Sequence, residues 1–77
     1  MKELLSFLAK SLVENPDAVT VKEAGEKEGS IVLELYVDPA DMGRVIGKQG
    51  KIAKAIRIVV KSAAMRDGKK VIVDIVG

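Results

Sequence analysis

The sequence contains no cysteine, no histidine and no tryptophan. Without cysteine the chain can form neither a disulfide nor a thiolate metal site. Without histidine it lacks the commonest metal ligand and the commonest general base. The acidic residues are scattered over predicted strands and loops, with no nucleophile or base beside them. We therefore predict no catalytic residue, no metal site and no cofactor, and we expect that the protein is not an enzyme.

Long apolar runs are also missing, since no stretch approaches the roughly 20 residues needed to span a bilayer. The N-terminus, with Lys2 and then Glu3 among leucines, lacks the layout of a signal peptide. We therefore expect a cytoplasmic protein without a membrane span. The composition, 48% hydrophobic and 31% charged over 77 residues, predicts one small globular domain over residues 1–77.

The net charge of +2 hides a strong asymmetry along the chain. Residues 1–41 carry four basic and nine acidic side chains, whereas residues 42–77 carry nine basic and two acidic ones. Such a division favours a directional anionic partner such as a nucleic acid. It is equally compatible with a basic half that only neutralises the acidic half, so charge alone does not separate the two interpretations.

Apolar periodicity predicts the order α-β-β-α-α-β. The expected elements are a helix over 2–14, strands over 18–24 and 30–37 joined by a turn over 25–29, a short helix through 42–46, a helix over 51–65 and a strand over 71–76. A helical crossover favours parallel pairing of the last two strands, while the first two should pair antiparallel. The predicted fold class is α+β, a three-stranded mixed sheet with three helices on one face. Asp38 or Asp41 is expected to cap the short helix.

Alternation and helical spacing also predict which residues form the core. In strand 30–37 the core face should carry Ile31, Leu33, Leu35 and Val37. In helix 51–65 the core stripe should be Ile52, Ile56, Val59, Val60 and Ala63.

Three glycines, Gly43, Gly47 and Gly50, fall within eight residues at the junction of the two middle helices. Each costs about 1 kcal/mol in a helix interior, so we interpret them as a tight turn that another backbone can approach closely. Lys48 lies at its tip and Lys51 follows in the next helix, whose N-terminus favours anions. This combination predicts a phosphate-binding site.

Two other phosphate loops do not fit this segment. A P-loop needs Gly-x4-Gly-Lys-Ser/Thr, but here three residues separate Gly43 from Gly47, and Gln49 follows Lys48. A dinucleotide fingerprint needs Gly-x-Gly-x-x-Gly directly after a strand, whereas these glycines lie between helices.

The segment 45–50 (VIGKQG), between two helices in this element order, resembles the GXXG motif of a type II KH domain. The wider stretch 41–57 (DMGRVIGKQGKIAKAIR) is similar to the small stand-alone bacterial KH proteins of the KhpA family, and the resemblance covers essentially the whole chain. It implies a type II KH fold. It also implies that the protein binds RNA and acts as an RNA chaperone, holding about four nucleotides of single-stranded RNA at the GXXG loop.

The resemblance also implies roles for individual residues. Gly47 and Gly50 would shape the loop, while Lys48 and Gln49 would meet the phosphates. The full predicted RNA-binding set is Gly47, Lys48, Gln49, Gly50, Ile46, Lys51, Arg44 and Lys54.

Several neighbours of the loop carry alternatives. Ile46 and Ile52 either line an apolar groove or simply pack in the core. Lys51 and Lys54 are interpreted as a basic track that continues from the loop, whereas Arg57 and Lys61 lie farther along the helix and are assigned to a solvated face. The scarcity of aromatics, only Phe7 and Tyr36, favours a GXXG loop over an RRM or OB-fold that stacks bases on rings.

A second hypothesis is an interaction or assembly module with little RNA binding of its own. The outer sheet face should present Val32, Tyr36, Ile72 and Val76, an apolar patch suited to a homodimer. The resemblance further implies pairing with a larger KH-containing protein that is KhpB-like, and a role in cell shape and cell wall biogenesis.

Overall fold

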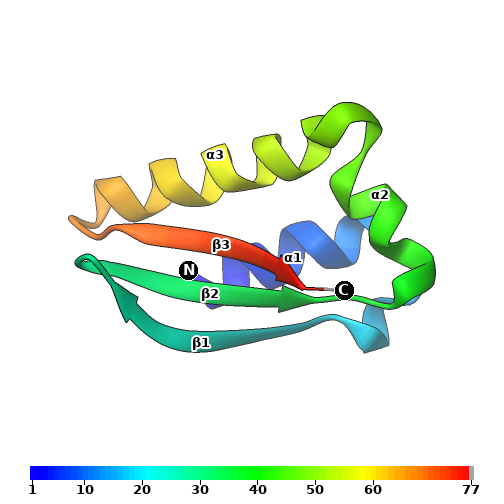
Figure 1. Cartoon of the computed structure of the whole chain (residues 1–77), viewed down its shortest axis with the longest axis horizontal. Helices are drawn as coiled ribbons and strands as arrows, with labels where there is room; N and C mark the ends of the chain where they lie inside the picture. Colours follow the sequence, from blue (N-terminus) through cyan, green and yellow to red (C-terminus); the bar gives the residue numbers. More distant parts are fainter. Residues whose placement is uncertain (77) are drawn as a thin grey trace.

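The computed structural model describes residues 1–76; Gly77, the last residue of the predicted domain, lies outside the described residues. Within residues 1–76, three α-helices and three strands follow the predicted order α-β-β-α-α-β (Figure 1). The elements are α1 (Lys2–Leu12), β1 (Thr20–Lys27), β2 (Ser30–Tyr36), α2 (Met42–Ile46), α3 (Lys51–Arg66) and β3 (Val71–Val76).

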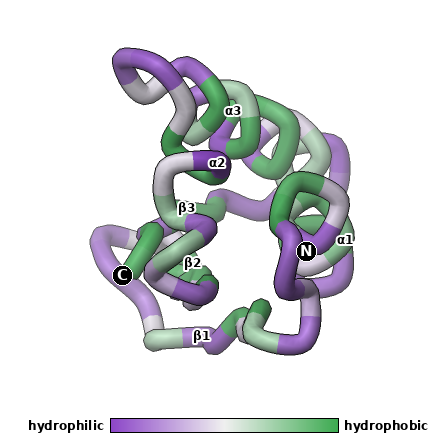
Figure 2. The backbone as a smooth tube through the Cα atoms, turned by 90° about the vertical axis from the view of Figure 1, so that its right-hand side faces the viewer, coloured by the Kyte–Doolittle hydropathy of each residue, from purple (hydrophilic) through white to green (hydrophobic). Residues whose placement is uncertain are grey.

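The sheet has the order β1-β2-β3. β1 pairs antiparallel with β2, and β2 pairs parallel with β3 in a register that sets Ile31 opposite Val71 and Tyr36 opposite Val76. Both pairings confirm the prediction. β2 and β3 are parallel because the helical segment between them carries the chain back to the end of the sheet where β2 begins. α1 and α3 lie side by side on one face of the sheet (Figure 2), which confirms the predicted α+β fold class.

The core lies between the helices and the face of β2 that carries Leu33 and Leu35, which are 2% and 0% exposed. This confirms the predicted inner face of the strand. Facing these leucines are buried residues from both long helices, Leu5, Ala9, Ile56, Val60 and Ala64. Burial of a large apolar side chain contributes about 1.5–3 kcal/mol, and such burial is the main source of stability of the fold.

The predicted core stripe of α3 is wrong at Val59, which is 45% exposed, and at Ala63, which is only half-buried and lies outside the core cluster. The buried stripe instead includes Ala53 and Ala64. α3 is therefore turned so that alanines as well as Ile56 and Val60 face inward, and the small side chains let the helix approach its neighbours closely. At 16 residues α3 is the longest helix, and no helix in the described part of the chain has the length and apolar character needed to cross a membrane.

The first hairpin also differs from the prediction. β1 begins at Thr20 rather than Ala18, because residues 16–18 form a 3-10 turn. It then continues past Ala24 to Lys27 through an irregularity in its pairing between Glu23 and Glu26. The predicted five-residue turn is only Glu28 and Gly29, with φ of 53° and 81°, a backbone suited to a tight two-residue hairpin.

Two aspartates fix the approach to α2. Asp38 caps the 3-10 turn Pro39–Asp41 by accepting the Ala40 N–H at 2.9 Å, so the predicted capping role belongs to the turn before α2. This bond, and then one from the Asn15 side chain, lower the pKa of the Asp38 carboxyl. Asp41 makes no capping bond.

Asp41 is instead a buried carboxylate, only 3% exposed. Its two oxygens accept the N–H groups of Glu14 at 3.2 Å and Asn15 at 3.1 Å. These bonds tie the segment after α1 to the start of α2, and α1 ends at Leu12 rather than near residue 14. The short helix that leads into the glycine loop is thereby anchored to a distant part of the chain.

Candidate nucleic-acid interface

The loop between α2 and α3 consists of Gly47, Lys48, Gln49 and Gly50. Three of these residues have positive φ: Gly47 at 73°, Gln49 at 57° and Gly50 at 74°. The Gly47 N–H donates to the Gly43 carbonyl at 2.9 Å and closes α2. This backbone reverses the chain direction within four residues, a path that L side chains rarely allow.

Besides its positive φ, close packing against Ile52 also requires glycine at position 47. A Cβ atom at this position would lie 2.6 Å from Cγ1 of Ile52, whereas a Cβ at Gly50 would have no neighbour within 4 Å. Ile52 is half-buried and packs between the loop and the core. The bare backbone of Gly47 thus rests directly on the first turn of α3.

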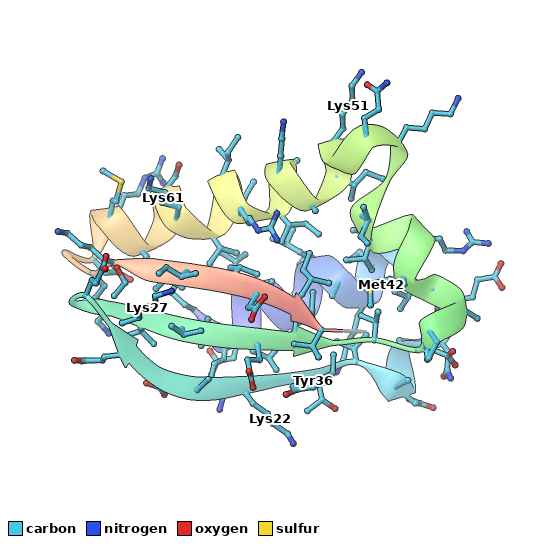
Figure 3. All side chains as sticks on the ribbon, viewed as in Figure 1. Lys22, Lys27, Tyr36, Met42, Lys51 and Lys61 are labelled. Atoms are coloured by element: carbon cyan, nitrogen blue, oxygen red, sulfur yellow. The ribbon has the colours of Figure 1, made fainter. Side chains whose placement is uncertain are left out.

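The tip of the loop is positively charged and open to solvent. Lys48 and Gln49 are both exposed, and Lys51 and Lys54 are exposed on the first turn of α3. Figure 3 shows Lys51 at the loop end of α3 and Lys61 near its other end. The N-terminus of this helix adds partial positive charge. The loop therefore offers several donors to an anion that approaches from outside.

The two isoleucines beside the loop differ in environment. Ile46 is 39% exposed, next to the loop on α2, and so it presents an apolar surface to solvent. Ile52 packs against the core cluster, which supports the core interpretation for this residue.

The basic residues of α3 border two different grooves. Lys51 lies with Leu8, Leu12 and Val59 along a groove between α1 and α3. A second groove, of about 590 Å³, lies between α3 and β3 and is lined by Ser30, Arg57, Lys61, Met65, Lys70, Val71, Ile72 and Val73. Lys51 and Lys54 are both exposed and lie three residues apart, so helical spacing places them on one side of α3.

Arg57 is exposed, as a solvated helix face requires, but its side chain also contacts β3. Its Nε donates to the main-chain carbonyl of Val73 at 3.2 Å, so the side chain bridges α3 and β3. Sequence periodicity shows that Arg57 and Lys61 share a helix face, but only the packing of α3 shows that this face borders β3.

Arg44 interacts with acidic residues. Its Nη2 lies 2.7 Å from Oε1 of Glu14, and its Nε lies 3.6 Å from Oδ1 of Asp41. Because the pair with Glu14 is exposed, it contributes about 1 kcal/mol or less. Arg44 is thus held toward the segment after α1. A phosphate that binds Arg44 would have to replace only its weak ion pair with Glu14.

The outer face of the sheet is partly apolar. Ile72 is 41% exposed, and Val32, Tyr36 and Val76 are half-buried. The Tyr36 hydroxyl donates to Glu34 at 2.8 Å, and this hydrogen bond raises the pKa of the phenol. Within residues 1–76, no group of three His, Cys, Asp or Glu side chains is placed to hold a metal ion.

The element order, the mixed sheet and the G-x-x-G loop between two helices define a type II KH fold. A family model described as the KhpA/KhpB KH domain matches residues 2–75, and the chain belongs to this family.

Named relatives match the chain over almost its whole length. The RNA-binding protein KhpA of Clostridium perfringens is 60% identical over 76 residues, which is 99% of this chain and 100% of that protein. The RNA-binding protein KhpA of Aquifex aeolicus is 45% identical over 75 residues, 97% of this chain and 94% of the relative.

A solved structure supports the fold alone. The crystal structure of Aquifex aeolicus Era Y63A bound to GDP.AlF4- aligns with a TM-score of 0.66 and 21% identity, over 96% of this chain and 28% of the Era chain. The same arrangement of helices and strands thus occurs within a longer protein.

Proposed function

We propose that this chain is a non-catalytic KH domain that binds single-stranded RNA through the Gly47–Gly50 loop. The observation that carries the proposal is a loop with two glycines at positive φ that joins exposed lysines to the N-terminus of a 16-residue helix. The relatives called RNA-binding protein KhpA match nearly the whole chain and support it.

The sugar–phosphate backbone would cross the loop, where Gly47 and Gly50 leave space for close approach. Lys48, Gln49 and Lys51 would contact phosphate oxygens, and the N-terminus of α3 would add favourable dipole charge. The strand would then follow the groove between α3 and β3, beside Arg57 and Lys61. Ile46 would contact the apolar face of a base.

Electrostatic attraction between the loop and the phosphates should supply most of the affinity. With about three phosphates contacted, the logarithm of affinity should fall with the logarithm of salt concentration at a slope near −2, because each neutralised phosphate of a single strand contributes about −0.7. Base identity should matter less than this attraction.

The loop is tested by the double substitution Lys48→Asp with Gln49→Asp. Both side chains are exposed, so the fold should persist, while two negative charges should repel the RNA backbone and remove most of the binding. The matched control is Thr20→Asp with Lys22→Asp, which makes the same charge change at exposed positions of edge strand β1.

Binding is measured by fluorescence anisotropy with a labelled single-stranded RNA over a salt series, and circular dichroism checks folding. The loop variant should lose most of its affinity and the control should keep nearly all of it. If the folded loop variant binds as tightly as the wild type, the proposed loop contact is wrong.

We also propose the finer parts of the family resemblance. We propose that residues 1–77 form one domain and that the protein is an RNA chaperone located in the cytoplasm. We further propose that it pairs with a larger KH-containing protein and that it contributes to cell shape and cell wall biogenesis. The single family model shared by KhpA and KhpB supports the pairing. A wild-type protein that binds no single-stranded RNA would instead favour the assembly module.

A further inference from the structure

The segment after α1 is attached to the start of α2 by a buried carboxylate. Asp41 is 3% exposed, and its two oxygens accept the N–H groups of Glu14 at 3.2 Å and Asn15 at 3.1 Å. A carboxylate that accepts a main-chain N–H on each oxygen holds that main chain in place through two charge-assisted bonds. The point from which the Glu14 side chain extends is therefore fixed relative to α2.

Arg44 extends from α2 toward the same point. Its Nη2 lies 2.7 Å from Oε1 of Glu14, and its Nε lies 3.6 Å from Oδ1 of Asp41. A single guanidinium thus meets two carboxylates, one at the surface and one buried. The Arg44 and Glu14 side chains are 53% and 76% exposed, so an anion from solution can reach the guanidinium from outside.

Arg44 also lies close to the glycine loop along the chain. It belongs to α2, the short helix whose last residue, Ile46, is followed directly by Gly47. A guanidinium stays charged and binds carboxylate and phosphate in the same manner, through parallel N–H donors. The carboxylate of Glu14 therefore occupies Arg44 in the way that a phosphate of a strand crossing the loop would.

The two carboxylates at Arg44 differ in how easily an anion can replace them. Asp41 is buried and also holds two main-chain N–H groups, so displacing it would leave those donors without their acceptor. Glu14 is exposed, and its side chain is bonded to Arg44 alone among residues 1–76. An anion that binds Arg44 therefore has to break only the contact with Glu14.

We propose that Glu14 is an intramolecular competitor of RNA: it pairs with Arg44 in the free protein and is displaced when a phosphate binds there. This inference rests on the proposed RNA binding. The attraction gained between Arg44 and a phosphate is offset by the loss of the pair with Glu14. Arg44 therefore adds little to the affinity while Glu14 is present, and removal of the Glu14 charge raises the affinity.

The test is a double-mutant cycle of Glu14→Gln and Arg44→Gln. Affinity is measured at low salt by fluorescence anisotropy with a labelled oligouridine of about eight nucleotides, twice the length that a GXXG loop contacts. Glu14→Gln should tighten binding about threefold, within the range of an exposed ion pair. In the Arg44→Gln background the same change should have almost no effect.

The matched control is Asp17→Asn, which removes one negative charge from the same connecting segment. Asp17 is exposed and takes part in no ion pair within residues 1–76. Its substitution should therefore change the affinity less than Glu14→Gln does, and by the same factor with and without Arg44. Circular dichroism checks the folding of each variant, and all three positions are exposed.

The outcomes separate this inference from the proposed function. If Glu14→Gln binds no more tightly than the wild type, or tightens binding equally with and without Arg44, Glu14 is not a competitor although RNA binding stands. An equal dependence of Asp17→Asn on Arg44 also overturns the role of Glu14. If neither the wild type nor Glu14→Gln binds the strand, both proposals are wrong. Tighter binding by Glu14→Gln that requires Arg44 supports the inference.

Discussion

At the scale of single residues, Gly47 and Gly50 look equivalent in sequence, but packing against a neighbour restricts the residue at position 47 and not at position 50. Their φ values are 73° and 74°, but Gly47 has ψ 178°, a region almost confined to glycine, while Gly50 has ψ 13°, in the left-handed helical region. Only Gly47 also touches a neighbour, because a Cβ there would lie 2.6 Å from Ile52. The first glycine therefore serves backbone and packing together, and the second serves the backbone alone.

This difference predicts unequal costs for the same substitution. Gly47→Ala should lower the free energy of unfolding by about 2–4 kcal/mol, since strain and overpacking both contribute. Gly50→Ala should cost about 1–2 kcal/mol from φ alone. Urea unfolding of both variants measures the difference, and equal losses would contradict the role given to Ile52.

Asp38 predicts a pH dependence of stability. Hydrogen bonds from Ala40 and Asn15 hold its pKa below the ordinary value of 3.8, so the folded state binds the proton less readily than the unfolded state. The stabilisation is fully present above the ordinary pKa and is lost as pH falls through the lower folded value.

Carboxyl NMR should show Asp38 titrating below pH 3.8 in the folded protein. In urea unfolding, the free energy of unfolding should fall less between pH 7 and pH 3 for Asp38→Asn than for the wild type, because the variant has no carboxyl to protonate at position 38. A midpoint at or above the ordinary value would show that the two hydrogen bonds do not favour the carboxylate in solution.

At the scale of elements, the sequence predicts best where apolar alternation is strict. β3 has its predicted bounds of 71–76, and the inner face of β2 is correct. β1 is predicted poorly because glycine marks both turns and irregular strand positions, and Gly25 lies in the strand at φ 102°. For Arg57, helical spacing identifies a face but not the strand that borders it.

The two faces of β2 predict a sharp contrast. Leu33, 2% exposed, lies inside and half-buried Val32 lies on the outer face. Leu33→Ala should destabilise the protein by about 2–5 kcal/mol, because it leaves a cavity in the core. Val32→Ala should cost clearly less. Thermal or urea unfolding of both variants checks this, and a loss below about 1 kcal/mol for Leu33→Ala would contradict the core assignment.

At the scale of the whole molecule, the charge asymmetry of the chain becomes an asymmetry in space. The acidic half forms α1, β1 and β2, and the basic half forms α2, α3 and β3. In Figure 1, β1 and α3 lie on opposite sides of the molecule. An uneven charge distribution of this kind favours the approach of a polyanion from the α3 side and speeds its association, most strongly at low salt.

The outer sheet face predicts weak self-association. Exposed Ile72 with half-buried Val32 and Tyr36 forms an apolar surface on β2 and β3. Sedimentation equilibrium should show dimers of the wild type at high micromolar concentration, and Val32→Glu should shift the protein to monomers because it places a charge in the contact. A wild type that stays monomeric throughout this range would rule out the homodimer.

The parallel pairing of β2 with β3 also orders the events of folding. β1 and β2 are joined by the two-residue turn Glu28–Gly29, and such a hairpin closes within microseconds. Ile31 and Val71 must meet across the whole α2–α3 segment, and closing so long a loop is slow. We therefore expect the β1–β2 hairpin to form early in folding and the α3–β3 groove to form late.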